Sequence, residues 1–406
     1  MALPPSPAPL TQEAYVWQHA HNASVQNAIA EHGSAFRQIT VLAAEVTWPP
    51  RAEASPEIKR ISLKLPPANT CPPIGLAIRV HAYRGSFSPE APATRQLVAL
   101  AHELISRIEA DGHHVREFQI DFDAAESQLD AYRCWLEALR SSLAPVPVAF
   151  TALPSWLDHP AAFTRLARAA DGFILQVHSL ALPASPDALA PLCDPGAALR
   201  AIRLAAEAGV PFRVALPTYG YEAAFDPRRH RFLGLAADGS ARAWPADAII
   251  RTVRADPATL ANLVSGLQRH HPAALTGLTW YRLPIFGERL NWPWPTLAAV
   301  MDGREPAAKV SIEAVSAPAD PALIRLVLRN SGEADAISLS DVVINWSDAR
   351  RVAADALAGF SIDAETTTRV RLSPPSGFRL PPDATLPVGW LRLNHAPSSF
   401  HATLSP

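Results

Sequence analysis

The stretch that decides the fold is Val115-Arg-Glu-Phe-Gln-Ile-Asp-Phe-Asp-Ala-Ala-Glu126. The run from Val115 to Ile120 predicts a strand, and a helical pattern follows from Glu126 to Leu143. A strand that delivers Asp121 and Asp123 at its tip, just before a helix, is typical of barrel and open α/β enzymes. Because side chains two apart lie on one face of a strand, we expect both carboxylates on the same face.

This arrangement has two interpretations. Like charges at close range raise the pKa of one carboxyl, which then becomes a proton donor near neutral pH. Alternatively, one of Asp121 and Asp123 caps the next helix and the other pairs with an arginine. Glu126 follows as a third carboxylate.

Composition bounds the class of protein. The chain has 406 residues, of which 49% are apolar, so we expect two or three domains with a large core. Its formal net charge is −2, which argues against nucleic acid or an anionic membrane as a partner. No run approaches the ~18 apolar residues of a membrane span. The three cysteines lie far apart without a CxxC motif, which argues against a structural zinc site and a disulfide framework.

Residues 1–13 are expected to form a flexible, proline-rich lead without the charged and apolar regions of a signal peptide. The sequence leaves two compartments open. The protein is cytoplasmic, or it is periplasmic or secreted if a signal segment has been removed.

Eight strand–helix pairs are predicted in residues 14–305. The strands are Ala14–Gln18, Phe36–Val46, Ile74–Ala82, the opening stretch, Val146–Leu153, Gly172–Leu180, Pro211–Thr218 and Leu275–Leu283. Alternating strands and helices imply parallel pairing, and this count predicts an α/β fold of the eight-stranded parallel β/α (TIM) barrel type. A doubly wound sheet is the alternative architecture. We also expect an extra strand at Ile61–Leu65 and an inserted hairpin with its turn at Asp238-Gly239.

Residues 308–406 change in character, because short strand-like runs follow one another without helices between them. They are Val310–Val315, Leu323–Arg329, Asp341–Trp346, Thr367–Leu372 and Trp390–Leu393. This pattern predicts a C-terminal β-sandwich accessory domain, which either binds sugar or supports the barrel.

The other predicted strand ends bring polar and aromatic groups to the same rim as Asp121. They are Trp17, Glu45, Arg79, His81, Gln176, His178, Tyr219, Tyr221, Trp280 and Arg282. Carboxylates beside aromatic rings suit a sugar, because the rings stack on pyranose faces and the carboxylates act as acid and base. Structural roles remain open for each residue, such as core packing for Trp280 or pairing with an aspartate for Arg79.

Other chemistries are less well supported. No spacing signature of a metal site is present, although His81 and His178 with the aspartate pair leave a metal-assisted hydrolase as a remote alternative. The sequence has no phosphate-binding loop and no GxSxG nucleophile motif. We therefore predict no metal and no cofactor.

Several motifs carry a resemblance to a bacterial barrel family, the domain of unknown function numbered 3142. They are Tyr15-Val-Trp17-Gln18, Gln119-Ile-Asp-Phe-Asp123, Pro217-Thr-Tyr219-Gly and Gly277-Leu-Thr-Trp280-Tyr-Arg282. The resemblance covers the barrel and implies its fold, but no activity.

The chain also resembles, more distantly, chitinase-like (family 18 type) glycoside hydrolases, whose fourth strand carries DxxDxDxE and whose eighth ends in a tryptophan. Asp121 and Asp123 match the second and third acids of that motif, and Trp280 matches the tryptophan. Phe118 stands at the first position, and Ala125 at the position of the catalytic glutamate.

Two functions follow as hypotheses. The first is a glycoside hydrolase-like protein acting on a polysaccharide, with Asp121, Asp123, Glu126 and Glu45 as its acid and base groups. The second, motivated by Ala125, is a non-catalytic glycan-binding or scaffold protein on a degenerate glycosidase barrel. In both, a polysaccharide or oligosaccharide is the partner, and the aromatic residues of the rim bind it.

Overall fold

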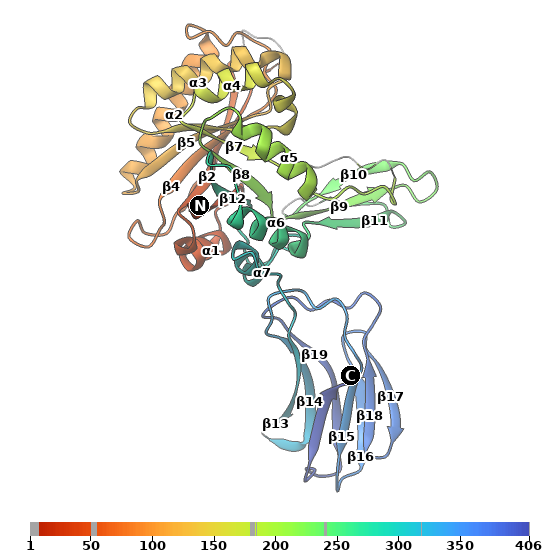
Figure 1. The fold of residues 1–406 in the computed structure, drawn as a ribbon. Coiled ribbons are helices and arrows are strands. Elements are labelled where there is room, and N and C mark those ends of the chain that lie inside the picture. Colours follow the sequence, from red (N-terminus) through yellow and green to blue (C-terminus); the bar gives the residue numbers. More distant parts are fainter. Residues whose placement is uncertain are drawn as a thin grey trace, which may run out of the picture. The chain divides into compact units, whose positions relative to one another are not determined.

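The structure is a computed structural model that describes residues 8–49, 55–178, 183, 185–238, 242–317 and 319–405 (Figure 1). The chain divides into two compact units, one ending at Trp292 and the other beginning at Pro293. Each unit encloses its own hydrophobic core.

The first unit is a closed barrel of eight parallel strands within the described residues, which confirms the predicted fold. Around the barrel the strands are β1 (Thr11–Val16), β2 (Gln38–Thr47), β4 (Ile74–Val80), β5 (Val115–Phe122), β6 (Val148–Ala152), β7 (Gly172–Gln176), β8 (Phe212–Pro217) and β12 (Leu275–Tyr281). The barrel closes because β1 pairs with both β12 and β2, so the doubly wound alternative is wrong. The carboxyl ends of all these strands therefore meet at one rim.

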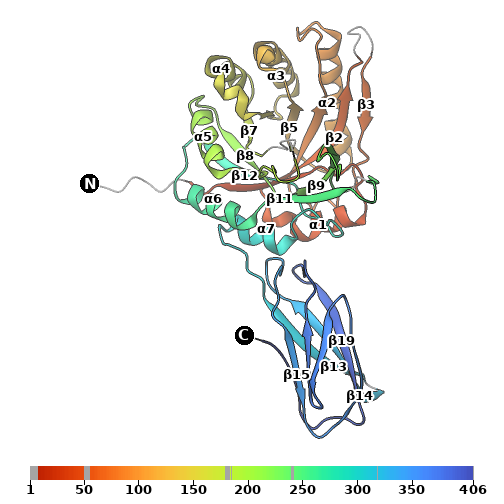
Figure 2. The same cartoon turned by 90° about the vertical axis from the view of Figure 1, so that its right-hand side faces the viewer.

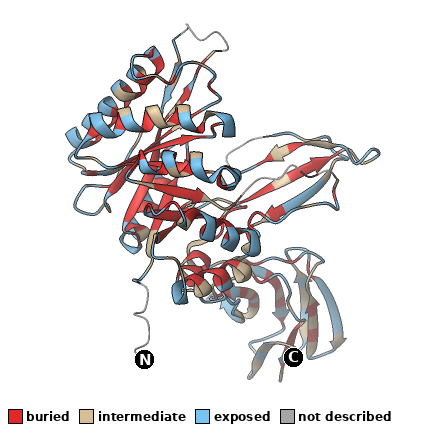
Figure 3. Cartoon of the chain, turned by 45° about the horizontal axis from the view of Figure 1, so that its top comes forward, coloured by how far each residue is buried: buried red, intermediate tan, exposed pale blue. Residues whose placement is uncertain are grey.

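Helices surround the barrel and connect its strands (Figures 1 and 2). The α-helices are α1 (Ala23–His32), α2 (Pro92–Ala110), α3 (Leu129–Leu143), α4 (Pro160–Arg168), α5 (Pro195–Ala206) and α6 (Pro257–Arg269), and the short 3-10 turns are η1 (Gly33–Ala35), η2 (Glu126–Gln128) and η3 (Pro154–Asp158). Asp194 and Asp256 cap α5 and α6 by accepting a backbone N–H from the first turn, and a proline follows each cap. These local signals fix where both helices begin. Figure 3 shows the barrel strands as largely buried.

The extra strand next to β2 lies earlier than predicted. It is β3 (Glu57–Arg60), which pairs antiparallel with the carboxyl end of β2. The predicted strand at Ile61–Leu65 is wrong, because only Ile61 continues toward β2, with its N–H donated to the carbonyl oxygen of Ala43 at 2.9 Å. In this register Lys59 lies opposite Glu45 on the neighbouring strand, and the two side chains form an ion pair at 3.2 Å.

An inserted three-stranded sheet follows β8. Its strands are β9 (Gly220–Phe225), β10 (Phe232–Ala236) and β11 (Ile249–Arg254), in the order β10-β9-β11. The predicted hairpin turn at Asp238-Gly239 is wrong, because β10 pairs with β9 and not with a following strand; Gly239 itself lies outside the described residues. Asp238 instead accepts three backbone N–H groups, from Arg289, Leu290 and Asn291, at 2.9, 2.8 and 3.0 Å.

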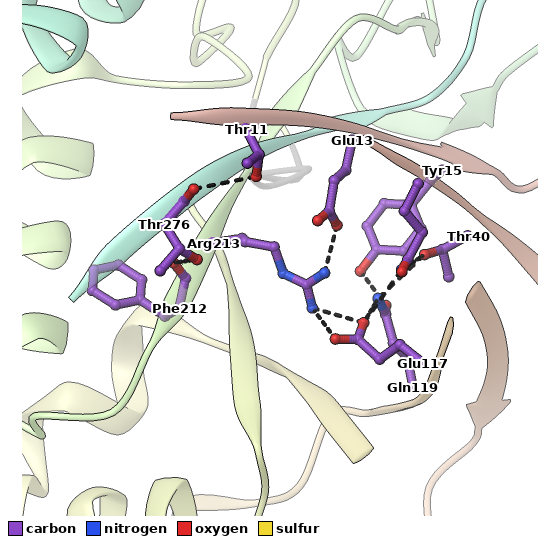
Figure 4. A network of polar contacts seen from close by, with 10 residues as sticks. Thr11, Glu13, Tyr15, Thr40, Glu117, Gln119, Phe212, Arg213 and Thr276 are labelled. Carbon is purple, nitrogen blue, oxygen red and sulfur yellow. Dashed lines mark hydrogen bonds and ion pairs between the residues drawn. The ribbon is translucent and has the colours of Figure 1, made fainter. Parts of the chain in front are cut away.

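The base of the barrel interior is polar (Figure 4). Arg213 of β8 donates to Glu13 of β1 at 2.5 Å and to both oxygens of Glu117 of β5 at 2.7 and 2.8 Å. Burial raises the pKa of Glu13, and the positive charge of Arg213 opposes this effect. One cation between two carboxylates satisfies charges that would otherwise be very costly to bury.

The next layer toward the rim extends this network. Gln119 donates to Glu117 at 2.6 Å and accepts the Tyr15 hydroxyl at 2.7 Å. Gly75 of β4 provides the space, since a Cβ there would lie 2.5 Å from both Gln38 Nε2 and Thr40 Oγ1. The layer thereby fixes the tyrosine that lies directly beneath the carboxyl rim.

The second unit contains two four-stranded antiparallel sheets, consistent with the predicted β-sandwich. One sheet has the order β13 (Val310–Ala317), β14 (Asp320–Asn330), β19 (Thr385–Leu393), β16 (Arg351–Ala356); the other has the order β17 (Ser361–Thr366), β18 (Arg369–Ser373), β15 (Val342–Trp346), β20 (Phe400–Leu404). Sequence analysis missed β16, β17 and β20. The reason is clear for β17, where most residues are exposed and the apolar alternation is weak.

The last predicted helix also belongs to the second unit. It is α7 (Trp294–Met301), for which the sequence predicted a helix only over Leu297–Met301. The Thr296 hydroxyl donates to the carbonyl oxygen of Glu333, which ties the helix to the polar turn after β14.

Candidate functional site

The predicted aspartate pair lies at the carboxyl end of β5, beside an arginine of β4. Arg79 and Asp121 are register partners on these two strands. Arg79 donates through Nη1 to Asp121 Oδ2 at 2.7 Å and through Nη2 to Asp123 Oδ2 at 2.5 Å. The Thr151 hydroxyl of β6 donates to Asp121 Oδ1 at 2.6 Å, so both oxygens of Asp121 are occupied.

Opposing effects set the charge of Asp121. Burial raises the pKa of this carboxyl, while the charge of Arg79 and the hydrogen bonds from Thr151 and Arg79 lower it. Burial also disfavours the charged form of Arg79, but the charges of Asp121 and Asp123 outweigh it and raise the pKa of the guanidinium. Asp121 is therefore a fixed, hydrogen-bonded acceptor.

A small cavity of about 30 Å³ opens beside Asp121. It is lined by Tyr15, Trp17, Asp121, Thr151, Gln176, His178, Ala215 and Tyr281. A water molecule fits this volume, but a sugar ring does not. A larger ligand would lie above the cavity, where Trp17, Gln176 and Tyr281 are only partly buried.

Aromatic rings form one wall of the cavity. Trp17 contacts Tyr15 edge-on, with ring centroids 5.1 Å apart, and packs against Tyr281 at 5.7 Å. Tyr281 stacks on His178 at 5.4 Å and meets Tyr219 edge-on at 5.5 Å. This mutual packing fixes the ring orientations before any ligand arrives.

His178 is a buried, neutral imidazole. Burial lowers its pKa to about 4. Its Nδ1 lies 3.3 Å from the Tyr219 hydroxyl. Burial also raises the pKa of Tyr281 to about 12, so this phenol remains protonated and can donate a hydrogen bond. The site thus combines neutral donors and acceptors with one paired carboxylate.

A known protein family matches the barrel unit of the chain. The family described as Domain of unknown function (DUF3142) matches residues 84–286, half of the chain. This chain belongs to the DUF3142 family. The matched segment runs from the loop after β4 to the loop after β12, so it includes Asp121, His178 and Tyr281 but not Trp17.

Solved structures match this DUF3142 protein at low sequence identity. The spore cortex-lytic enzyme SleL of Bacillus cereus is 12% identical, with a TM-score of 0.50 over 73% of this chain and 75% of that one. A chitinase from Chromobacterium violaceum ATCC 12472 is 16% identical, with a TM-score of 0.49 over 72% of this chain and 98% of that one. None of the curated proteins matches. The predicted family is confirmed, and the likeness to glycoside hydrolase barrels is one of fold.

The remaining predicted carboxylates of this DUF3142 barrel contact histidine and lysine side chains away from the cavity. Glu45 lies 3.0 Å from His19 and 3.2 Å from Lys59. Burial raises its pKa, but hydrogen bonds from both partners outweigh this and lower the pKa overall. Glu126 begins η2, lies 3.2 Å from His159 and is half-exposed. Neither side chain lines the cavity beside Asp121.

Several predicted ligand residues also lie away from the cavity. Trp280 is fully buried, donates its indole N–H to Gln12 at 2.7 Å and therefore offers no ring face to a sugar. Tyr221 is buried in the inserted sheet. His81 follows β4 as an exposed residue. We do not keep these three in the candidate site.

Arg282 belongs to a polar network beside the cavity. It donates to Glu288, which also accepts from Gln18 at 3.2 Å and from Asn291 at 2.7 Å. The network joins the residue after Trp17 to the residue after Tyr281. Arg282 thus holds the aromatic wall and does not line the cavity.

The sequence analysis missed four residues of the cavity, namely Tyr15, Thr151, Ala215 and Tyr281. Strand alternation could have found two of them. Tyr15 precedes Trp17 by two residues on the same face, and Tyr281 points opposite to its neighbour Trp280. Because Trp280 matches the tryptophan of the chitinase-like motif, the sequence predicted the wrong face of β12 for the site.

Metal and membrane features were searched over the described residues. In that part of the chain, no group of three or more His, Cys, Asp or Glu side chains is placed to hold a metal ion. There, no helix has the length and apolar character needed to cross a membrane.

Proposed function

We propose that this protein binds a polysaccharide segment at the carboxyl rim of its glycoside hydrolase-like barrel. The observation that carries the proposal is the pair of partly exposed rings, Trp17 and Tyr281, beside Asp121 and Gln176. Aromatic faces stack on the apolar faces of sugar rings, and carboxylate and amide groups bind their hydroxyls.

Binding without cleavage fits the electrostatics best. A glycosidase requires a protonated acid positioned beside the scissile bond. Asp121 and Asp123 share one arginine, while Glu126 contacts His159 and Glu45 contacts Lys59, both away from the cavity. Ala125 stands where the chitinase-like motif has its acid, and it has no titratable group.

Hydrolysis remains a second candidate because burial raises the pKa of Asp121, which lines the cavity. In this reading Asp121 acts as the acid or base, and the water-sized cavity beside it holds the nucleophile. Release of reducing ends that disappears in Asp121→Asn would support this candidate over binding alone.

The test is affinity electrophoresis of the full chain in gels containing individual polysaccharides, with reducing ends measured in parallel. Trp17→Ala and Tyr281→Ala are expected to weaken retardation roughly 10-fold, because each removes about 1 kcal/mol or more of ring contact. Ile337→Ala, which removes an exposed apolar side chain of the second unit, serves as the control. Equal retardation of Trp17→Ala and wild type would refute the proposed site.

A further inference from the structure

The inserted sheet ends in a turn rich in arginine. Residues 226–231, here called the arginine turn, connect β9 to β10 and include Arg228, Arg229 and Arg231. All three side chains are exposed. Asp226 fixes the turn, because its carboxylate accepts the backbone N–H groups of Arg228 and Arg229 at 2.9 and 2.8 Å. The arginines therefore project from a defined backbone.

The inserted module, residues 219–255, has more arginines than carboxylates. Residues 219–255 contain six arginines and four acidic residues, a formal charge of +2, whereas the whole chain has −2. Asp226 and Asp238 bind backbone N–H groups, and Glu222 lies 3.9 Å from Arg289. Within the part of the chain that the structure describes, none of the guanidinium groups of the arginine turn forms an ion pair with a carboxylate.

Surface arginines elsewhere in the barrel unit are frequently paired. Arg60 binds Glu103 at 2.7 Å, Arg165 binds Asp130 at 2.7 Å, and Arg133 binds Glu137 at 2.5 Å. The turn holds three arginines and one carboxylate, Asp226, whose pKa is lowered by the backbone N–H groups of Arg229 and Arg228 and by nearby arginine charges. The excess of like positive charge repels itself and adds nothing to folding. The arginine turn is therefore suited to an external anion.

The position of the turn relates it to the proposed glycan site. β9 begins at Gly220, directly after Tyr219 of the aromatic cluster, and the sheet extends outward from the barrel (Figure 1). Its six residues span roughly 20 Å at about 3.3 Å per residue. Only an extended polymer reaches from the barrel rim to the arginine turn.

We propose that the polysaccharide bound at the barrel rim is anionic and that the arginine turn binds its acidic groups. This inference deepens the proposed function and rests on it. Guanidinium groups match carboxylate and sulfate oxygens in geometry and charge. A polymer, in contrast to a monosaccharide, engages both contacts at once and gains affinity from their linkage.

The test compares polymers that share a backbone and differ in charge. Polygalacturonate and its methyl ester form one pair, and carboxymethyl cellulose and hydroxyethyl cellulose form the other. Affinity electrophoresis of the full chain is expected to show stronger binding to the charged member, weakening as salt rises. Arg228→Gln/Arg229→Gln/Arg231→Gln is expected to weaken that binding roughly 3- to 30-fold, as for the loss of three exposed charge contacts.

The control variant is Arg107→Gln/Arg116→Gln/Arg168→Gln, which removes three exposed arginines near the opposite, amino-terminal end of the barrel strands. It is expected to bind like the wild type. Equal weakening in both triple variants, or equal binding to charged and neutral polymers, overturns the inference and leaves the proposed function standing. Retardation by neither polymer of a pair overturns both.

Duplex DNA and vesicles of anionic phospholipid are included as competing anions. Stronger binding to either than to the charged polysaccharides overturns the inference, because the arginine turn would then serve a different class of partner. Binding to the charged polysaccharides that requires both Trp17 and the arginine turn is the supporting result.

Discussion

Arg79 holds Asp121 and Asp123 through separate nitrogens of one guanidinium group. The arginine comes from β4 and the two carboxylates from the tip of β5, so the contact joins adjacent strands at the rim. Its single positive charge also offsets part of the repulsion between the two carboxylates. Of the structural interpretation of this pair, the arginine contact is found, but neither aspartate caps a helix, since η2 and α3 have no side-chain cap hydrogen bond.

We predict that Arg79→Gln destabilises the protein by about 3–5 kcal/mol at pH 7, because it leaves the buried charge of Asp121 without its cation. The pKa of Asp121, already raised by burial, would rise further. A raised folded-state pKa gives stability at low pH that is lost as pH rises, so the deficit should shrink between pH 7 and pH 5. Urea unfolding at both pH values measures this. Arg133→Gln, at an exposed ion pair, should change stability by less than about 1 kcal/mol.

Gly75→Ala is expected to destabilise the barrel by about 1–3 kcal/mol, since the added Cβ would lie 2.5 Å from Gln38 Nε2 and Thr40 Oγ1. Gly266→Ala is the matched control. It lies inside α6 with nothing within 4 Å of the new Cβ, and it should stabilise the protein by roughly 0.5–1 kcal/mol. Thermal unfolding of both variants decides the matter, and a destabilised Gly266→Ala would contradict this account.

His178 should make stability depend on pH in mildly acidic solution. Its folded-state pKa is lowered to about 4 by burial, from the model-compound value of 6.5. A lowered folded-state pKa contributes stability that is present above 6.5 and lost as pH falls toward 4, on the order of 3 kcal/mol in total. His178→Asn is expected to flatten the stability profile over that range. His81→Asn, at an exposed histidine, should retain the wild-type profile.

Substitutions of Trp280 and Trp17 should affect different properties, namely stability for Trp280 and glycan affinity for Trp17. Trp280→Phe removes a buried indole hydrogen bond to Gln12 and is expected to cost about 1–3 kcal/mol of stability, with glycan affinity unchanged. Trp17→Ala should lower glycan affinity. Denaturation and gel retardation of each variant test this pair, and loss of glycan affinity in Trp280→Phe would restore the role first expected for that residue.

The sequence predicted the barrel well because each strand has its own apolar run and each helix its own signals. Asp194 and Asp256 predict the starts of α5 and α6 through capping alone. The strands of the accessory sandwich were found less completely, because edge strands such as β17 carry little apolar alternation. Pairing between strands separated by another strand, as for β9 and β11, is not encoded in local pattern at all.

The site was harder to predict than the fold. Residues at strand ends were placed near the rim correctly for Asp121, Gln176 and His178. Whether a given side chain faces inward depends on a one-residue register, which separates Tyr281 from Trp280. The partner of each charge depends on neighbours far along the chain, so the sequence predicted an arginine partner for one aspartate as an alternative but not that Arg79 contacts both.

The three backbone contacts of Asp238 have a practical consequence for engineering. Asp238, which follows the inserted strand β10, holds the loop after β12 through three hydrogen bonds, although more than fifty residues separate them in sequence. That loop also carries Phe286, whose ring is 92% exposed. Excising residues 219–255 to obtain a minimal barrel would therefore also release the loop on the far side of the aromatic wall. The inserted sheet and this loop should therefore be transplanted or deleted together.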